Sequence, residues 1–211
     1  MKNERKNKTE ASGFSIVELL IAVTIMIVVL GLVGSLLSQS LSTRQRERSR
    51  TDALTSAQAA LNVMSREIAN SGYGLTSNGI VTADSNQQQL HFISNVANNN
   101  AVLTNRYENV TYFFDPVTSS ILRHDANGDG TAAPQTSIII NRISNVNFLY
   151  FNYTGSNSAP TSSTTPSSST GRVRVTLTVS LENVQGQPSG QSVVLVSDVT
   201  LRNSRYMLQN Y

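Results

Sequence analysis

Apolar residues form one long stretch near the N-terminus and then recur at two different spacings further along the chain. Residues 14–37 are apolar apart from Glu18 and a few small hydroxyl residues. About 20 apolar residues in a helix are enough to span a hydrocarbon core of ~30 Å. The stretch therefore predicts a membrane-spanning helix. The alternative is the buried core helix of a soluble protein, which is seldom this long and this apolar on every side.

A second apolar pattern predicts that the helix continues beyond the membrane. No Pro interrupts residues 14–70, and Gly72 and Gly74 supply a stop. The resulting helix would have about 57 residues. In its second half, residues 38–72, apolar residues recur at the three- and four-residue spacing of an amphipathic helix. We expect this stripe to pack on the protein's own sheet, because a coiled coil would need sustained heptads. The stripe consists of Leu54, Ala57, Leu61, Met64 and Ile68.

From Leu90 onward the apolar period becomes two, which is typical of strands. The segments "LHFISNV" and "VTYFFDPVTSSILRH" predict strands, the latter a hairpin that turns at Asp115-Pro116. One or two more strands are expected in "SIIINRISNVNFLYFNY". "GRVRVTLTVSLE" alternates cleanly and predicts a half-buried antiparallel strand that pairs with "QSVVLVSDVTLRN". The expected fold class is α+β, a long N-terminal helix packed on a small antiparallel sheet head in residues 73–211.

The segment 154–170 contains "TGSNSAPTSSTTPSSST" and has almost no apolar side chains. Such a composition cannot build a core of its own. We expect an exposed, disordered loop within the head.

Charge does not settle how the chain lies in a membrane. The first 13 residues carry Lys2, Arg5, Lys6 and Lys8, and the flank after the apolar stretch carries Arg44, Arg46, Arg48 and Arg50. Because these counts are equal, the positive-inside rule gives no orientation. The net charge of +3 rests partly on the N-terminal segment, and Glu47 and Asp52 break up the arginine run. We therefore expect no nucleic-acid partner, although DNA binding by the run is an alternative.

Glu18 is the one charged residue of the apolar stretch, and it stands five residues after Gly13. A carboxylate is tolerable near a membrane interface, but within a dry bundle of helices it needs a cation. Cleavage after Gly13 would place a new α-amine on Phe14, one helical turn from Glu18. That amine could pair with its own Glu18 or with Glu18 of a neighbouring copy, and the pairing would set the axial register.

The N-terminal motif resembles a known family. A short basic leader that ends in Gly13, followed by "FSIVELLIA", is similar to the class III signal peptides of type IV pilins, minor pilins and type II secretion pseudopilins. The resemblance implies cleavage of the leader 1–13 by prepilin peptidase, N-methylation of Phe14, and a role of Glu18 in methylation and filament docking. It also implies an inner-membrane protein with a cytoplasmic leader and a periplasmic head.

Two further motifs narrow the resemblance. "REIANSGYG" (66–74) and "VTLRNSR" (199–205) resemble corresponding segments of PilW-type minor pilins. The implied function is a non-enzymatic subunit that primes type IV pilus assembly with other minor and major pilins and the inner-membrane assembly platform. Two alternatives remain: a J-type pseudopilin at the tip of a type II pseudopilus, and a tip subunit for adhesion or DNA uptake.

One motif suggests a metal site. Asp125, Asn127 and Asp129 form D-x-N-x-D-G with Gly130, the first half of a calcium loop. The twelfth position of an EF-hand, normally Glu, is Thr136, so only a calcium site closed by other ligands is compatible. The alternative is an Asx/Gly turn. No cysteine, nucleophile elbow, phosphate loop or zinc-protease motif occurs, and we expect no enzyme, no other cofactor and no small-molecule substrate.

Overall fold

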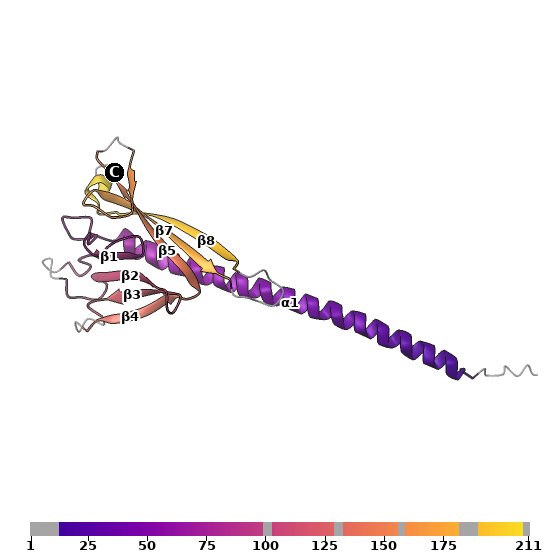
Figure 1. The fold of residues 1–211 in the computed structure, drawn as a ribbon. Coiled ribbons are helices and arrows are strands. Elements are labelled where there is room, and N and C mark those ends of the chain that lie inside the picture. Colours follow the sequence, from indigo (N-terminus) through magenta and orange to yellow (C-terminus); the bar gives the residue numbers. More distant parts are fainter. Residues whose placement is uncertain (1–12, 99–102, 129–132, 156–158, 182–189, 209–211) are drawn as a thin grey trace, which may run out of the picture. The chain divides into compact units, whose positions relative to one another are not determined.

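The computed structural model describes residues 13–98, 103–128, 133–155, 159–181 and 190–208. It contains one long helix followed by eight strands and a short C-terminal helix (Figure 1). The elements are α1 (Ile16–Ala69), β1 (Gln89–Ile93), β2 (Asn109–Asp115), β3 (Ser120–Asp125), β4 (Gln135–Ile140), β5 (Ile143–Asn152), β6 (Thr161–Ser163), β7 (Thr170–Ser180), β8 (Ser192–Thr200) and α2 (Arg205–Leu208). The α+β class is as predicted.

The helix α1 is continuous over 54 residues, close to the predicted length. It ends at Ala69, and Gly72 and Gly74 follow it with φ values of 76° and 66°. These left-handed conformations favour glycine, which explains why the helix stops there. The chain divides into two compact units inside α1, between Arg46 and Glu47.

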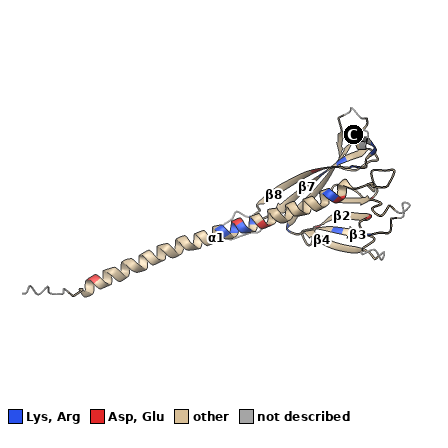
Figure 2. Cartoon of the chain, turned by 180° about the vertical axis from the view of Figure 1, so that it is seen from behind, with Lys and Arg blue, Asp and Glu red and all other residues tan. Residues whose placement is uncertain are grey.

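The first unit, as far as it is described, is an apolar helix with no covering. Its large apolar side chains are exposed, and Phe14 and Ile16 are each 79% accessible. The helix is long and apolar enough to cross a membrane. Figure 2 shows that charged residues are scarce over this part of α1 and become frequent further along the helix.

In the second unit, the amphipathic part of α1 packs on the strands, as predicted. Burial starts at Ala53 rather than at residue 38, and Leu54 is only half-buried. The side chains that α1 buries are small in the early turns and larger further along the helix. The buried residues of α1 are Ala53, Ala57, Ala60, Leu61, Met64, Ile68 and Ala69.

The strands form two antiparallel four-stranded sheets, whereas the sequence suggested one small sheet. Their orders are β1-β2-β3-β4 and β6-β5-β7-β8. The chain passes from one sheet to the other between β4 and β5, where Arg142 has a φ of 61°. This corner divides "SIIINRISNVNFLYFNY" into two strands of different sheets. The hairpin at Asp115-Pro116 joins β2 to β3, and β7 alternates as predicted, with Val173, Val175, Leu177 and Val179 buried.

The Ser/Thr-rich segment 154–170 is ordered where it is described, so the expectation of a disordered loop is wrong for those residues. Thr161–Ser163 form β6 on β5. The side-chain amide of Asn78 donates to the carbonyls of Ser167 at 3.0 Å and Thr170 at 2.9 Å. The segment is held in place by hydrogen bonds to polar groups that are distant in the sequence. Its own composition therefore did not predict that it would be ordered. Residues 156–158 lie outside the described residues.

Candidate functional site

The start of α1 combines a helix cap with the predicted assembly glutamate. Ser15 precedes the helix, its hydroxyl accepts from the Val17 amide at 3.4 Å, and its carbonyl accepts from the Leu19 amide at 3.1 Å. Ser15 is therefore the N-cap, and Glu18 stands three residues later in the S-x-x-E pattern of a capping box. A carboxylate in the first turn also suits the positive end of the helix dipole. The position of Glu18 in the first turn thus favours the start of the helix, an effect that the sequence reading missed.

The predicted cleavage site lies just before the helix. Gly13 and Phe14 have no regular secondary structure, and Phe14 is exposed. A Cβ atom placed on Gly13 would meet no atom of the described residues within 4 Å. The bond between them is therefore accessible in the chain as described, which is what a peptidase requires. Residues 1–12 of the predicted leader lie outside the described residues.

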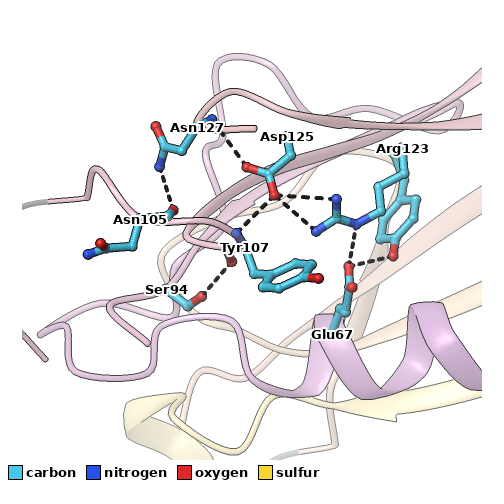
Figure 3. A network of polar contacts seen from close by, with 8 residues as sticks. Glu67, Ser94, Asn105, Tyr107, Arg123, Asp125 and Asn127 are labelled. Carbon is cyan, nitrogen blue, oxygen red and sulfur yellow. Dashed lines mark hydrogen bonds and ion pairs between the residues drawn. The ribbon is translucent and has the colours of Figure 1, made fainter. Parts of the chain in front are cut away.

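A polar network in the second unit joins α1 to the first sheet (Figure 3). Glu67 is near the end of α1, and its Oε2 atom accepts from the Tyr112 hydroxyl at 2.6 Å and from Arg123 Nε at 2.9 Å. The other two guanidinium nitrogens of Arg123 both lie 3.3 Å from Asp125 Oδ2. The Arg123 and Asp125 side chains are only 10% and 1% exposed. One buried cation therefore bridges two carboxylates.

The same network holds the loop before β2. Asp125 Oδ2 accepts from the Tyr107 amide at 2.9 Å, and the Arg123 guanidinium lies over the Tyr107 ring. Tyr107 has a φ of 69°, a strained value for a tyrosine. The Asn127 side chain donates to the carbonyls of Leu103 and Asn105. The network holds this loop through its main-chain atoms. The contacts therefore could not be predicted from the side chains of the loop.

This arrangement bears on the predicted calcium site. Asp125 Oδ1 accepts from the Asn127 amide at 3.2 Å, which is an Asx turn, and Oδ2 already faces Arg123. Asp125 therefore has a structural role in the described chain. Asp129 lies outside the described residues, so calcium binding by Asp125, Asn127 and Asp129 stays a prediction. In the described ranges, no three His, Cys, Asp or Glu residues cluster as metal ligands would.

Burial and neighbouring charges shift the pKa of two groups of the network, Tyr112 and Arg123. Burial, together with the neighbouring Glu67 carboxylate, raises the pKa of Tyr112 well above its ordinary range. For Arg123, burial alone would lower the pKa, but the hydrogen bond and the charge of Glu67 raise it above its ordinary value. Tyr112 is thus held as a neutral donor and Arg123 as a permanent cation. These states suit a rigid joint between helix and sheet.

Sequence reasoning placed Glu67 and Asp125 in motifs but did not bring them together. Glu67 was part of "REIANSGYG", and Asp125 was part of the acidic loop. Arg123 falls at an inward position of β3, whose burial pattern alternates around it. A basic residue at an inward-facing position of a strand was the one available signal for a buried ion pair. No family model, curated protein or solved structure matches this chain.

Proposed function

We propose that this chain is a minor-pilin-like structural subunit, held in the inner membrane by residues 14–37 and then built into a type IV pilus. The observation that carries the proposal is the continuity of α1. One helix begins just after Gly13 with Glu18 in its first turn, remains uncovered and apolar through its first part, and then supplies the buried stripe of the head.

An apolar surface of this size is not stable in water, so it must be covered by lipid or by other helices. The free-energy cost of the Glu18 carboxylate differs between these two environments. Near a membrane interface the carboxylate keeps contact with water and costs little, but in a dry helix bundle it requires a cation. Cleavage between Gly13 and Phe14 would create that cation at the Phe14 α-amine. Pairing of this amine with Glu18 of the same or a neighbouring subunit would then select one axial register.

The proposal includes the orientation and the partners that the motif suggests. Prepilin peptidase would remove residues 1–13 on the cytoplasmic side and methylate Phe14, and the head would lie in the periplasm. Pilins and the inner-membrane assembly platform would be the partners. The head would make lateral contacts, and no catalytic step is proposed for it.

The test compares Glu18→Gln and Glu18→Asp with a Gly13→Leu variant in a strain that lacks the native gene. Intact mass of the isolated protein reports cleavage and methylation, and electron microscopy counts surface pili with and without retraction. We expect Gly13→Leu to remain unprocessed, Glu18→Gln to be cleaved but to lose pili, and Glu18→Asp to retain a part of them. Loss of pili that retraction deficiency partly restores would support a priming role.

Three results would contradict the proposal. Gly13→Leu that still supports normal piliation would remove the role of processing. Unchanged pili combined with lost protein export would transfer the function to a type II secretion pseudopilin, the alternative suggested by the same motif. Unchanged pili with lost adhesion or DNA uptake would instead favour a tip-binding subunit.

A further inference from the structure

The strand β8 leaves one backbone edge of its sheet open. It is the last strand in the order β6-β5-β7-β8. At the two ends of the β7–β8 pair, the Leu201 amide donates to Gly171 and the Leu181 amide donates to Gln191, each at 2.9 Å. Since such bonds recur at every second residue of an antiparallel pair, the odd-numbered residues of β8 bond to β7. The backbone groups of Val194, Val196 and Asp198 therefore point away from β7.

Within the described chain, nothing covers this edge between residues 192 and 200. No backbone hydrogen bond joins the outward groups of Val194, Val196 or Asp198 to another segment of the part of the chain that the structure describes. The Val194 and Val196 side chains are 57% and 56% exposed. The helix α1 contacts the inward side chains of β8, where the Ser65 and Ser197 hydroxyls are hydrogen-bonded at 2.9 Å, and it contacts the chain again beyond the strand, where the Arg202 amide donates to the Ala69 carbonyl at 3.1 Å. An open edge with exposed valines is a surface that natural proteins usually protect.

A groove accompanies the open edge, between β8 and α1, which run side by side (Figure 1). Two hollows of about 540 and 460 Å³ share Asn62 and make up the groove. The first is apolar and is lined by Leu195 with Leu54 and Ala59 of α1. The second lies further along β8, and its lining includes Ser197, Asp198, Val199 and Arg202 with Ser65 and Arg66 of α1. The groove thus changes from apolar to polar along the strand.

The polar end of the groove is positively charged. Arg66 and Arg202 both line it, and within the described residues neither guanidinium has a hydrogen-bond or ion-pair partner. The nearby Asp198 carboxylate is already held by Arg174, at 2.7 and 2.9 Å. The hydrogen bonds from Arg174 lower the pKa of Asp198, and the charge of this carboxylate is matched by the Arg174 guanidinium rather than by Arg66 or Arg202. The two exposed guanidinium groups are therefore available to pair with an anionic group of a binding partner.

We propose that this groove binds an extended, acidic segment of a different protein chain, which adds to the sheet as a strand beside β8. Its backbone would pair with the outward groups of Val194, Val196 and Asp198. On its inward face, an apolar side chain would enter the hollow at Leu195, and a carboxylate would meet Arg66 and Arg202. Because side chains on one face of a strand alternate, the apolar and acidic residues would lie an even number of positions apart.

A second copy of this chain fits the groove less well. If two β8 strands paired with each other, the inward positions of the added strand would be Val193, Leu195, Ser197 and Val199. None of these could neutralise Arg66 and Arg202. Charge complementarity therefore selects a different chain. The inference goes beyond the proposed function, since neither the apolar stretch nor Glu18 takes part in it.

The test uses the full chain in phosphatidylcholine nanodiscs and two dye-labelled peptides, TETVTLT and TKTVTLT. Fluorescence anisotropy measures their binding, and hydrogen exchange follows the β8 amides. We expect TETVTLT to bind about tenfold more tightly than TKTVTLT, because only the glutamate can pair with the arginines. We also expect TETVTLT to slow exchange at Val194 and Val196, whereas Leu195, already bonded to β7, is slow without it.

Matched variants separate backbone pairing from charge. Val196→Pro removes an outward N–H that β7 does not use, and it should abolish binding, while Val196→Thr keeps that N–H and should preserve binding. The double variant Arg66→Gln/Arg202→Gln keeps the backbone and should remove the preference for glutamate over lysine. Circular dichroism shows whether Val196→Pro folds. If it does not, the double arginine variant still tests the proposal.

Three results would overturn the proposal. Equal binding of both peptides would remove the charge argument, and no binding would remove the groove as a strand site. Slow exchange at Val194 and Val196 without peptide, together with a concentration-dependent dimer, would show that a second copy covers β8.

Discussion

The Nε atom of Arg123 in β3 lies 2.9 Å from Oε2 of Glu67 in α1, and this ion pair joins residues 56 positions apart in the chain. It connects the end of the long helix to the middle of a sheet. Arg123 also faces the buried Asp125, so it neutralises two carboxylates at once. Any change that removes the cation leaves two carboxylates without a counter-ion, although Tyr112 still donates to Glu67 and the Tyr107 amide still donates to Asp125.

We therefore expect Arg123→Met to lower the free energy of unfolding by about 3 kcal/mol, within the range for breaking a buried pair. Glu67→Gln should cost less, since the amide oxygen still accepts from Tyr112. Urea denaturation of the full chain, followed by circular dichroism, measures both. The control is Arg174→Met, which breaks the exposed pair with Asp198 and should change stability far less. Equal losses in the two arginine variants would show that burial does not govern this pair.

The loop after α1 depends on a glycine at residue 79. Gly79 has a φ of 76°, and a Cβ there would lie 2.1 Å from the Gly72 nitrogen and 2.4 Å from the Ile93 carbonyl oxygen. Both are backbone atoms that pair with each other at 2.9 Å, so neither can move freely. We expect Gly79→Ala to cost about 3 kcal/mol or more, from strain plus displaced backbone hydrogen bonds.

Gly190 provides the matched control for Gly79, because it has nearly the same φ of 77° and, among the described residues, no atom within 4 Å of the added Cβ. Gly190→Ala should therefore cost only the conformational strain, about 1 kcal/mol. Thermal unfolding of the two variants measures the difference. If both variants lose the same stability, the close approach of the backbone at Gly79 contributes nothing.

Asn78 should control the order of the Ser/Thr-rich segment. Its amide donates to Ser167 and Thr170, and its Oδ1 accepts from the Ile80 amide at 3.2 Å. Asn78→Asp keeps the acceptor but replaces the donor with an anion facing two carbonyls. We expect limited proteolysis to cut within residues 161–169 at least about tenfold faster, since cleavage follows the population of the opened segment. Asn203→Asp, on the half-buried amide that reaches Ser71, serves as the comparison. Unchanged cleavage in Asn78→Asp would assign the order of the segment to β6 pairing alone.

The head should lose stability at alkaline pH. Burial raises the pKa of Tyr112 and Tyr150 above the ordinary value of 10.0. Above pH about 10 the unfolded chain releases these protons while the folded chain retains them, so unfolding becomes easier as pH rises. The expected slope is about 1.4 kcal/mol per pH unit for each tyrosine.

Urea midpoints between pH 8 and 11 measure this slope, and tyrosinate absorbance follows the ionisation itself. The variant Tyr112→Phe/Tyr150→Phe should show a flatter dependence on pH, although it starts from a lower stability. A wild-type slope no steeper than that of the double variant would show that both hydroxyls ionise within the folded head.

The sequence determined those features of this protein that depend on local periodicity. The extent of α1 follows from an uninterrupted apolar stretch, an amphipathic stripe and two following glycines. The strand β7 follows from strict alternation, and the β2–β3 hairpin from Asp115-Pro116. In each case the signal comes from residues close together in the chain, because helix and strand periods are properties of the local backbone. The leader cleavage and the role of Glu18 remain predictions from the N-terminal motif.

The tertiary structure alone decided how distant segments meet. It divided the strands into two sheets at Arg142, ordered residues 161–170 through Asn78, and placed Arg123 between Glu67 and Asp125. It also placed β8 at the edge of its sheet, next to α1. Apart from the inward position of Arg123 in its strand, these features have no local signature. The Glu67–Arg123 and Asn78–Thr170 contacts join residues 56 and 92 positions apart and depend on the packing of whole elements rather than on neighbouring residues.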